Sequence, residues 1–190
     1  NVTTGMTIES SLERLDKDLI AAAKLMTAQE IRYMVDTYYA MQKFRIGASN
    51  EDRALGEIGE PSATTLWLGE HFTHMENRTR RALQAWAEEY VPAKWMLSIT
   101  GIGPVLAAGF ASQIEWQKAE SPAHIWAFAG LDPTQEWKKG EKRPWNARLK
   151  VLCWKLGESF VKFQNNPSDF YGAFYVKRKA YEASKNEAGD

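Results

Sequence analysis

The spacing of the apolar residues constrains the fold of this chain more than any other feature. Between Thr7 and Met26 they recur at steps of three and four, which places them on one face of an amphipathic helix. Similar spacing returns along much of the sequence, whereas no stretch alternates apolar and polar residues for long enough to predict a strand. No internal repeat of fixed length is visible either. We therefore expect an all-α fold.

Local start and stop signals divide the first half of the chain into helices. Thr27 and Glu30 form a T-x-x-E capping box, which predicts a helix from there to about Phe44. Residues 47–62 contain several glycines and charges without apolar periodicity, so they predict a loop that can hold one short turn. A long helix is expected over 63–90, closed by Pro92. Its predicted inward-facing residues are Leu66, Phe72, Met75, Ala82, Leu83, Trp86 and Tyr90.

The predicted helices of the second half are mostly shorter. Proline favours the first position of a helix, which predicts helix starts at Pro104 and Pro122. Ser168 and Asp169 are expected to cap a last helix, and residues 130–144 to be irregular. The helices are expected over 93–99, 104–114, 122–129, 145–163 and 168–184.

Length and composition favour one folded core with an extension. A chain of 190 residues is long enough for one domain, or for a small domain with a helical extension. We predict an N-terminal helical extension over residues 1–94 and a separate helical domain over 95–190. Hydrophobic residues at 44% and charged residues at 25% disfavour disordered, collagen-like and coiled-coil-only chains.

The sequence carries no signal for export or membrane insertion. Charges interrupt every apolar segment before the roughly 20 residues needed to cross a bilayer, and no signal-peptide pattern opens the chain. The single Cys153 cannot form an internal disulfide, which fits a reducing compartment. We therefore expect a cytoplasmic protein without membrane contact. Because the sequence begins at Asn1 rather than Met, a preceding segment that carries functional residues stays possible.

The distribution of charge says more than its sum. The chain has 24 Lys and Arg against 24 Asp and Glu, which argues against a protein that is basic over its whole surface. Residues 1–100 carry 11 basic and 14 acidic side chains, whereas residues 101–190 carry 13 basic and 10 acidic ones. Any contact with a polyanion is therefore expected in the second half.

A Gly-x-Gly turn between two predicted helices is the sharpest local motif. The segment from Ser98 to Ala108 resembles a helix-hairpin-helix, in which two glycines permit a tight turn and close approach of a phosphate. Backbone N–H groups and the positive dipole end of the helix at Pro104 would then bind that phosphate without reading base sequence. Candidate binding residues here are Thr100, Gly101 and Gly103. The alternative is a turn that only lets two helices cross closely.

A basic, Trp-containing segment follows. Between Trp137 and Lys150 lie six basic residues against one acidic residue, Glu141. Lys and Arg can neutralise phosphates while Trp stacks on exposed bases, so the composition suits a nucleic acid. The candidate binding residues are Lys138, Lys139, Lys142, Arg143 and Arg148. The alternative is a solvated basic loop whose Trp rings pack into the core.

Signals for catalysis and for metals are weak. His71 and His74, with Glu70 and Glu76, can share a helix face, but a polar patch is the favoured interpretation because no third ligand of the usual spacing follows. No nucleophile–base pair is readable from spacing, and phosphate loops and nucleophile elbows are absent. The sequence assigns no catalytic residue, no metal site and no cofactor.

Several motifs in order resemble one family. The series runs from Leu97–Pro104 through Phe128–Pro133 and a basic Gly-containing loop to the helix around Arg148–Leu156. It resembles the C-terminal domain of the IS110-type insertion-sequence transposases, which use a bridge RNA. The tail from Asn166 to Lys179 also resembles the ending of that family.

The resemblance implies catalytic features that this sequence does not match. Members of that family join an RNase-H-like domain with four acidic metal ligands to a C-terminal domain whose serine attacks DNA. Residues 1–94 instead predict helices, and Lys139-Gly140 stands where the family has Ser-Gly. The nearest hydroxyl, Thr134, lies too close to Pro133 to match. Since a lysine cannot form the serine-linked intermediate, the resemblance implies the domain shape and a nucleic-acid surface rather than recombinase activity.

Three hypotheses remain at this point. The leading one is a transposase-derived, non-enzymatic protein that binds DNA or structured RNA. The second is a recombinase or nuclease component completed by another chain or by an upstream segment, with Asp132, Glu136, Thr134 and Ser98 as its nearby candidates. The third is a protein-interaction module whose residues 7–46 form a homodimer or bind a protein partner.

Overall fold

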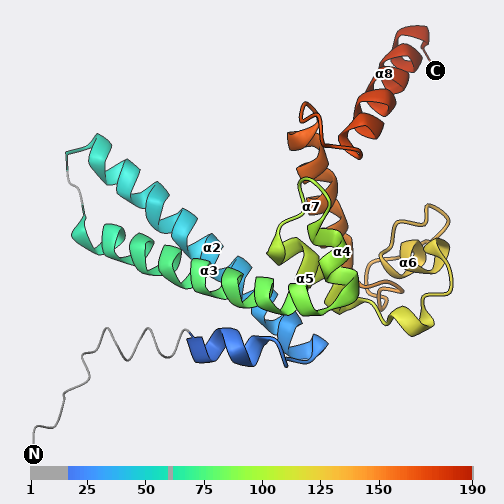
Figure 1. The fold of residues 1–190 in the computed structure, drawn as a ribbon. Coiled ribbons are helices and arrows are strands. Elements are labelled where there is room, and N and C mark those ends of the chain that lie inside the picture. The colour runs from blue at the N-terminus through green and yellow to red at the C-terminus, as the bar shows by residue number, and fades with distance from the viewer. Residues whose placement is uncertain (1–16, 60–61, 190) are drawn as a thin grey trace, which may run out of the picture. The chain divides into compact units, whose positions relative to one another are not determined.

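The computed structural model describes residues 17–59 and 62–189, and all the regular structure in these ranges is helical. No strand occurs among them, so the all-α prediction is confirmed (Figure 1). The chain divides into two compact units, Asn1–Tyr90 and Val91–Asp190. The functional division at residues 94 and 95 stays a prediction.

The first unit is built on two long helices. Residues 17–23 are helical, and α2 (Ala28–Glu57) and α3 (Ala63–Glu89) then run side by side in opposite directions (Figure 1). The helix predicted over 7–26 lies only partly within the described residues. At the start of α2 the capping box is confirmed, because Thr27 Oγ1 accepts from the Glu30 N–H and the Glu30 carboxylate accepts from the Thr27 N–H. The hydrogen bonds that the Glu30 carboxylate accepts from the Thr27 N–H and from the Thr27 hydroxyl lower the pKa of Glu30.

The predicted loop over 47–62 is wrong for most of its length, because α2 continues to Glu57. Two contacts between α2 and α3 hold this part of the helix. The Arg45 guanidinium pairs with the Glu76 carboxylate at 2.6 Å, and Thr65 Oγ1 donates to Asp52 Oδ1 at 3.3 Å. Contacts with α3 therefore stabilise a helix in this segment although its own sequence lacks apolar periodicity.

The interior of the first unit is strongest at one end of the helix pair. Ile31, Val35, Leu83 and Trp86 are buried there, and Trp86 Nε1 donates to the Met26 carbonyl. Of the residues predicted to face inward, Ala82, Leu83 and Trp86 are buried, but Leu66 is 51% exposed and Met75 is 48% exposed. Those two predictions are wrong because, among the described residues, the main neighbour of α3 in this part is α2, which leaves the other faces of the helix in solvent.

The second unit holds shorter helices around a small core. They are α4 (Val91–Leu97), α5 (Pro104–Gln113), the 3-10 helix η1 (Trp116–Lys118), α6 (Pro122–Phe128), α7 (Ala147–Phe163) and α8 (Gly172–Ala188). Helix α5 packs against α4 and α7, and Ile114, Ala129 and Leu149 form one buried cluster. The predicted starts at Pro104 and Pro122 are confirmed.

The start of the last helix differs from the prediction. Ser168 and Asp169 precede α8 by a few residues rather than capping it directly, since the helix begins at Gly172. Asp169 Oδ1 instead accepts from the Tyr171 N–H, which orders the turn before the helix. The helix start predicted at Ser168 therefore lies about one turn before the actual start of α8.

Candidate nucleic-acid interface

The predicted hairpin is a tight turn between α4 and α5 that packs against α7. Gly101 has a φ of +91°, a conformation that side-chain-bearing residues rarely adopt. A Cβ added there would lie 3.1 Å from Ser159 Oγ and 3.3 Å from Phe163 Cδ2. The Ser159 hydroxyl also donates to the Gly101 carbonyl. Gly101 is therefore required both by its backbone conformation and by the closeness of α7.

The other two hairpin residues differ in their surroundings. Thr100 is half-buried, and its hydroxyl donates to the Ser168 carbonyl at 3.1 Å, so this side chain joins the turn to the segment before α8. Gly103 is exposed, has a φ of −89°, and an added Cβ would meet nothing within 4 Å. Thr100 and Gly101 thus hold the turn in place, while Gly103 lies at its open side.

Gly103 is the N-cap of α5, and no side chain accepts a hydrogen bond from the first turn of that helix. The N–H groups of the first turn have no intrahelical acceptor, and Pro104 supplies no N–H. The N–H groups of Val105, which is buried, and of Leu106, which is half-buried, follow directly on the exposed Gly103. The positive end of the helix dipole adds to the attraction for an anion there.

The basic segment folds around its two tryptophans. Arg143 places its guanidinium 4.9 Å from the Trp137 ring, and Lys150 places its ammonium 4.8 Å from the Trp145 ring. The two indoles meet edge to face, with centroids 6.3 Å apart. We call Trp137, Arg143, Trp145 and Lys150 the cation–aromatic cluster. The sequence indicated Trp, Lys and Arg in this segment, but which cation rests on which indole depends on the path of the loop.

Several hydrogen bonds give the loop a defined shape. Trp137 Nε1 donates to the Glu141 carbonyl at 2.8 Å, and the Glu141 N–H donates to the Lys138 carbonyl at 3.1 Å. Gly140, with a φ of +99°, completes this turn. Lys138 and Lys139 are therefore held at the outer side of an ordered turn.

The end of the loop is joined to the core of the second unit. Trp145 lies directly over Gly130, where an added Cβ would come within 2.7 Å of its Cδ1 atom. The Asn146 N–H donates to the Phe128 carbonyl, and its side chain donates to Gln113 Oε1. The same side chain accepts from the N–H groups of Arg148 and Leu149, which caps α7. One residue therefore ties the loop to α5, α6 and α7.

The cations of the loop face solvent. Lys138, Lys139, Lys142 and Arg143 are exposed, and within the described ranges no ion pair joins them to an acidic side chain. Arg148 is also exposed, in the first turn of α7. The four loop cations are therefore available to an external anion.

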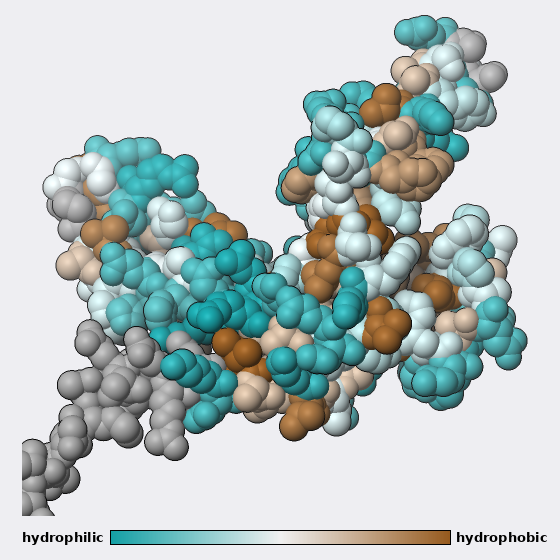
Figure 2. Space-filling model, in the orientation of Figure 1, coloured by the Kyte–Doolittle hydropathy of each residue, from teal (hydrophilic) through white to brown (hydrophobic). Residues whose placement is uncertain are grey.

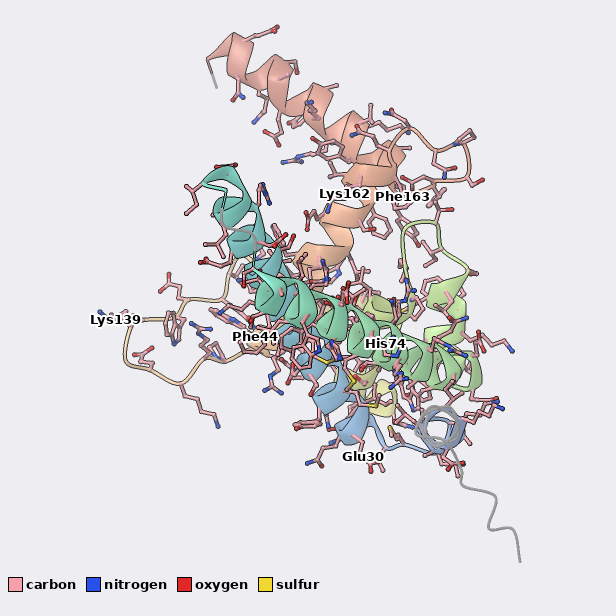
Figure 3. All side chains as sticks on the ribbon, turned by 90° about the vertical axis from the view of Figure 1, so that its left-hand side faces the viewer. Glu30, Phe44, His74, Lys139, Lys162 and Phe163 are labelled. Carbon is pink, nitrogen blue, oxygen red and sulfur yellow. The ribbon has the colours of Figure 1, made fainter. Side chains whose placement is uncertain are left out.

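The hairpin and the basic segment lie toward opposite ends of α7. The hairpin contacts Ser159 and Phe163, whereas the basic segment joins the helix at Asn146. Thirteen residues at about 1.5 Å each separate Asn146 from Ser159, which is roughly 20 Å. Figure 3 shows Lys139 on the outer part of its loop, well away from Lys162 and Phe163. The sequence did not predict this separation.

The candidates for catalysis and metal binding are engaged in local contacts. Asp132 Oδ1 accepts from both the N–H and the hydroxyl of Thr134, which lowers the pKa of Asp132. The Ser98 hydroxyl donates to the Trp95 carbonyl. The described part of the chain contains no group of three or more His, Cys, Asp or Glu side chains able to hold a metal ion.

The histidines of α3 have similarly local surroundings. His71 Nδ1 lies 2.8 Å from the Trp67 carbonyl, and its ring packs on the Trp67 indole. Figure 3 shows His74 on the same helix, α3, and Glu76 is occupied by Arg45. This geometry is that of a polar helix surface.

Comparison with known families adds the decisive observation. Residues 93–151 match the family model described as "Transposase IS116/IS110/IS902 family". This part of the chain is a transposase-family domain. The match covers the hairpin, α5, α6, the basic segment and the start of α7. The residues that pack on the hairpin from the other side, Ser159, Phe163 and Ser168, follow the matched range of this transposase-family domain.

Two further comparisons, with the curated proteins and with the solved structures, were made for the whole chain. Neither the curated proteins nor the solved structures gave a match to this chain. Within the described residues, no helix is both long and apolar enough to span a membrane.

Proposed function

We propose that the second unit binds DNA or structured RNA by contacting its phosphates, mainly through the basic segment and secondarily through the open side of the hairpin. The observation that supports this most is the cation–aromatic cluster. It places one exposed cation, Arg143, on a loop whose end is joined to three helices and another, Lys150, in the first turns of α7, within the range that matches the transposase family.

The chemistry of the basic segment suits a polyanion. Each Lys or Arg that neutralises a phosphate releases condensed counterions, which makes binding favourable and dependent on salt. Lys138, Lys139, Lys142 and Arg143 supply such charges, and Arg148 adds another at the start of α7. The Trp137 and Trp145 rings fix the directions of Arg143 and Lys150, so less side-chain freedom is lost on binding.

The hairpin supplies a second, smaller contact. The backbone N–H groups that follow Gly103 would donate to the oxygens of one phosphate, and a Cβ added at Gly103 would meet nothing within 4 Å. Thr100 and Gly101 act indirectly, by holding the turn against Ser168 and α7.

The test compares two double variants of equal charge. Lys142→Gln/Arg143→Gln removes two cations from the basic segment, and Lys43→Gln/Arg53→Gln removes two from α2. We expect only the first to weaken binding of a labelled duplex, to a similar extent for unrelated sequences. The slope of log affinity against log salt should fall by about 0.9 for each lost phosphate contact.

Fluorescence anisotropy at several salt concentrations measures both quantities. An unchanged affinity and slope in Lys142→Gln/Arg143→Gln would remove those residues from the interface. Equal losses in the two double variants would reduce the effect to net charge. Absence of binding by the parent chain to duplex, single-stranded and branched DNA and to hairpin RNA at low salt would refute the proposed function.

A second candidate function concerns residues 7–46, as a dimerisation or partner-binding segment. Its described part exposes large apolar side chains on α2 and just before it. Leu25 is 88% exposed, Tyr33 73% and Phe44 60%, although Phe44 also stacks on Phe72. Light scattering after size exclusion tests this candidate, since a monomeric mass at high concentration would exclude the homodimer.

A further inference from the structure

We propose that Trp154 on α7 is a stacking platform for an unpaired base of single-stranded DNA, next to the phosphate contacts of the basic segment. This inference rests on the proposed function, since it names the form of nucleic acid that this surface takes. Trp154 is 65% exposed, on a helix whose apolar side packs in the core. Figure 2 shows hydrophobic residues reaching the surface of the second unit among hydrophilic ones.

The position of Trp154 on α7 directs it away from the core. Leu149 and Leu152 are buried, and successive residues of an α-helix are about 100° apart. Trp154 therefore lies roughly 140° and 160° around the helix axis from those two leucines. The indole of Trp154 therefore faces solvent rather than the core, where it is accessible to a ligand.

Trp154 also lies next to the cation–aromatic cluster. Helical side chains lean toward the N-terminus, so its indole covers the turn that holds Lys150 and Val151. Lys150 is four residues earlier, on the same face, and its ammonium rests over Trp145. Trp154 therefore lies one turn beyond the Lys150 end of the cluster, whose two indoles are half-buried.

The C-terminal side of Trp154 is open. Gly157, one turn further along α7, is exposed, and a Cβ added there would meet nothing within 4 Å. Glycine within a helix costs about 1 kcal/mol relative to alanine, and no close packing explains it here. The acidic neighbour Glu158 is paired with Lys162 at 2.8 Å, which reduces its repulsion of a phosphate.

This surface fits a single strand better than a duplex. A duplex hides the faces of its bases and offers only phosphates and base edges, whereas an indole stacks on a base face. The cations beside Trp154 match the charge of the backbone that accompanies such a base. We commit to DNA because the matched family consists of transposases.

The test separates stacking from charge. Oligo(dT) and a duplex of mixed sequence are titrated with the full chain and with Trp154→Ala, Trp154→Phe and Trp95→Ala. Trp95 is the control because it is 62% exposed on α4. Alanine favours helices, so Trp154→Ala should stay folded, which circular dichroism checks.

We expect Trp154→Ala to bind oligo(dT) roughly 5- to 150-fold more weakly, which corresponds to the ~1–3 kcal/mol of one stacked base. Duplex affinity should change less than about twofold, Trp154→Phe should recover part of the loss, and Trp95→Ala should bind like the parent. Equal losses for both DNAs, or no loss, would refute the role of Trp154 while leaving the duplex-binding proposal intact.

Three further outcomes would also overturn the inference. A larger effect on oligo(rU) than on oligo(dT) would assign the surface to RNA. Conversion of a dimer to a monomer by Trp154→Ala would assign it to a second copy of the chain. If the parent chain binds no nucleic acid at all, both this inference and the proposed function fail.

Discussion

The sharpest prediction about the fold concerns Gly101, which we expect to be far less replaceable than Gly103. In Gly101→Ala the residue must keep a φ of +91°, which costs about 1–2 kcal/mol for a residue with a Cβ. The new methyl group would also lie 3.1 Å from Ser159 Oγ and 3.3 Å from Phe163 Cδ2, so α7 or the turn must shift by a few tenths of an ångström. Together these effects give a loss of roughly 2–3 kcal/mol in the free energy of unfolding.

Gly103→Ala is the matched control. Its φ of −89° suits any residue, and the added methyl group meets nothing within 4 Å. Only the poorer N-cap preference of alanine remains, which costs about 0.5–1 kcal/mol. Urea unfolding of the full chain, followed by circular dichroism, measures both variants. Equal losses in the two variants, or a loss below about 1 kcal/mol in Gly101→Ala, would refute the inferred packing of the turn on α7.

Two other outcomes are expected. Gly103→Asp should stabilise the chain by a few tenths of a kcal/mol, because aspartate is a better N-cap than glycine. The same variant should bind DNA more weakly, because its carboxylate occupies the position of the phosphate. Urea unfolding measures the first effect and anisotropy the second, and unchanged binding would exclude the hairpin from the interface. Burial raises the pKa of Tyr39 to about 12. Because the unfolded chain loses this proton first, near pH 10, stability should fall as the pH rises from about 10 to 12. Loss of that fall in Tyr39→Phe checks the assignment.

The elements that the sequence predicts well begin with local signals. The Thr27–Glu30 capping box and the prolines at 104 and 122 each specify a helix start within a few residues, and each is confirmed. Such signals need no knowledge of the rest of the chain, since the hydrogen bonds and backbone angles involved are local.

Elements that depend on distant partners are predicted less well. The end of α2 lacks apolar periodicity and contains Gly47 and Gly56, so composition favours a loop. Its helical form coincides with the Arg45–Glu76 ion pair and the Thr65–Asp52 hydrogen bond, both of which need α3 beside it. Neither partner can be identified from spacing along one helix.

The candidate interface shows the same contrast. Residue types alone identify the basic segment and the Gly-x-Gly turn. Tertiary structure decides that Thr100 and Gly101 are engaged in packing while Gly103 is open. It also decides that Arg143 rests on Trp137, which no periodicity along the chain reveals. A contact of Thr100 with nucleic acid stays a prediction, while the structure shows its hydroxyl donating to the Ser168 carbonyl.

Helix α7 contacts both the basic segment and the hairpin. Its first turn is capped by Asn146, which also holds the basic segment, and its last turns bear Ser159 and Phe163, which hold the hairpin. The family match ends at residue 151, so it includes the first of these connections but not the second. The conformation of Gly101 within the matched segment thus depends on residues that follow it. In this chain the hairpin is therefore held by the end of α7 and the turn at Ser168, both of which follow the matched range.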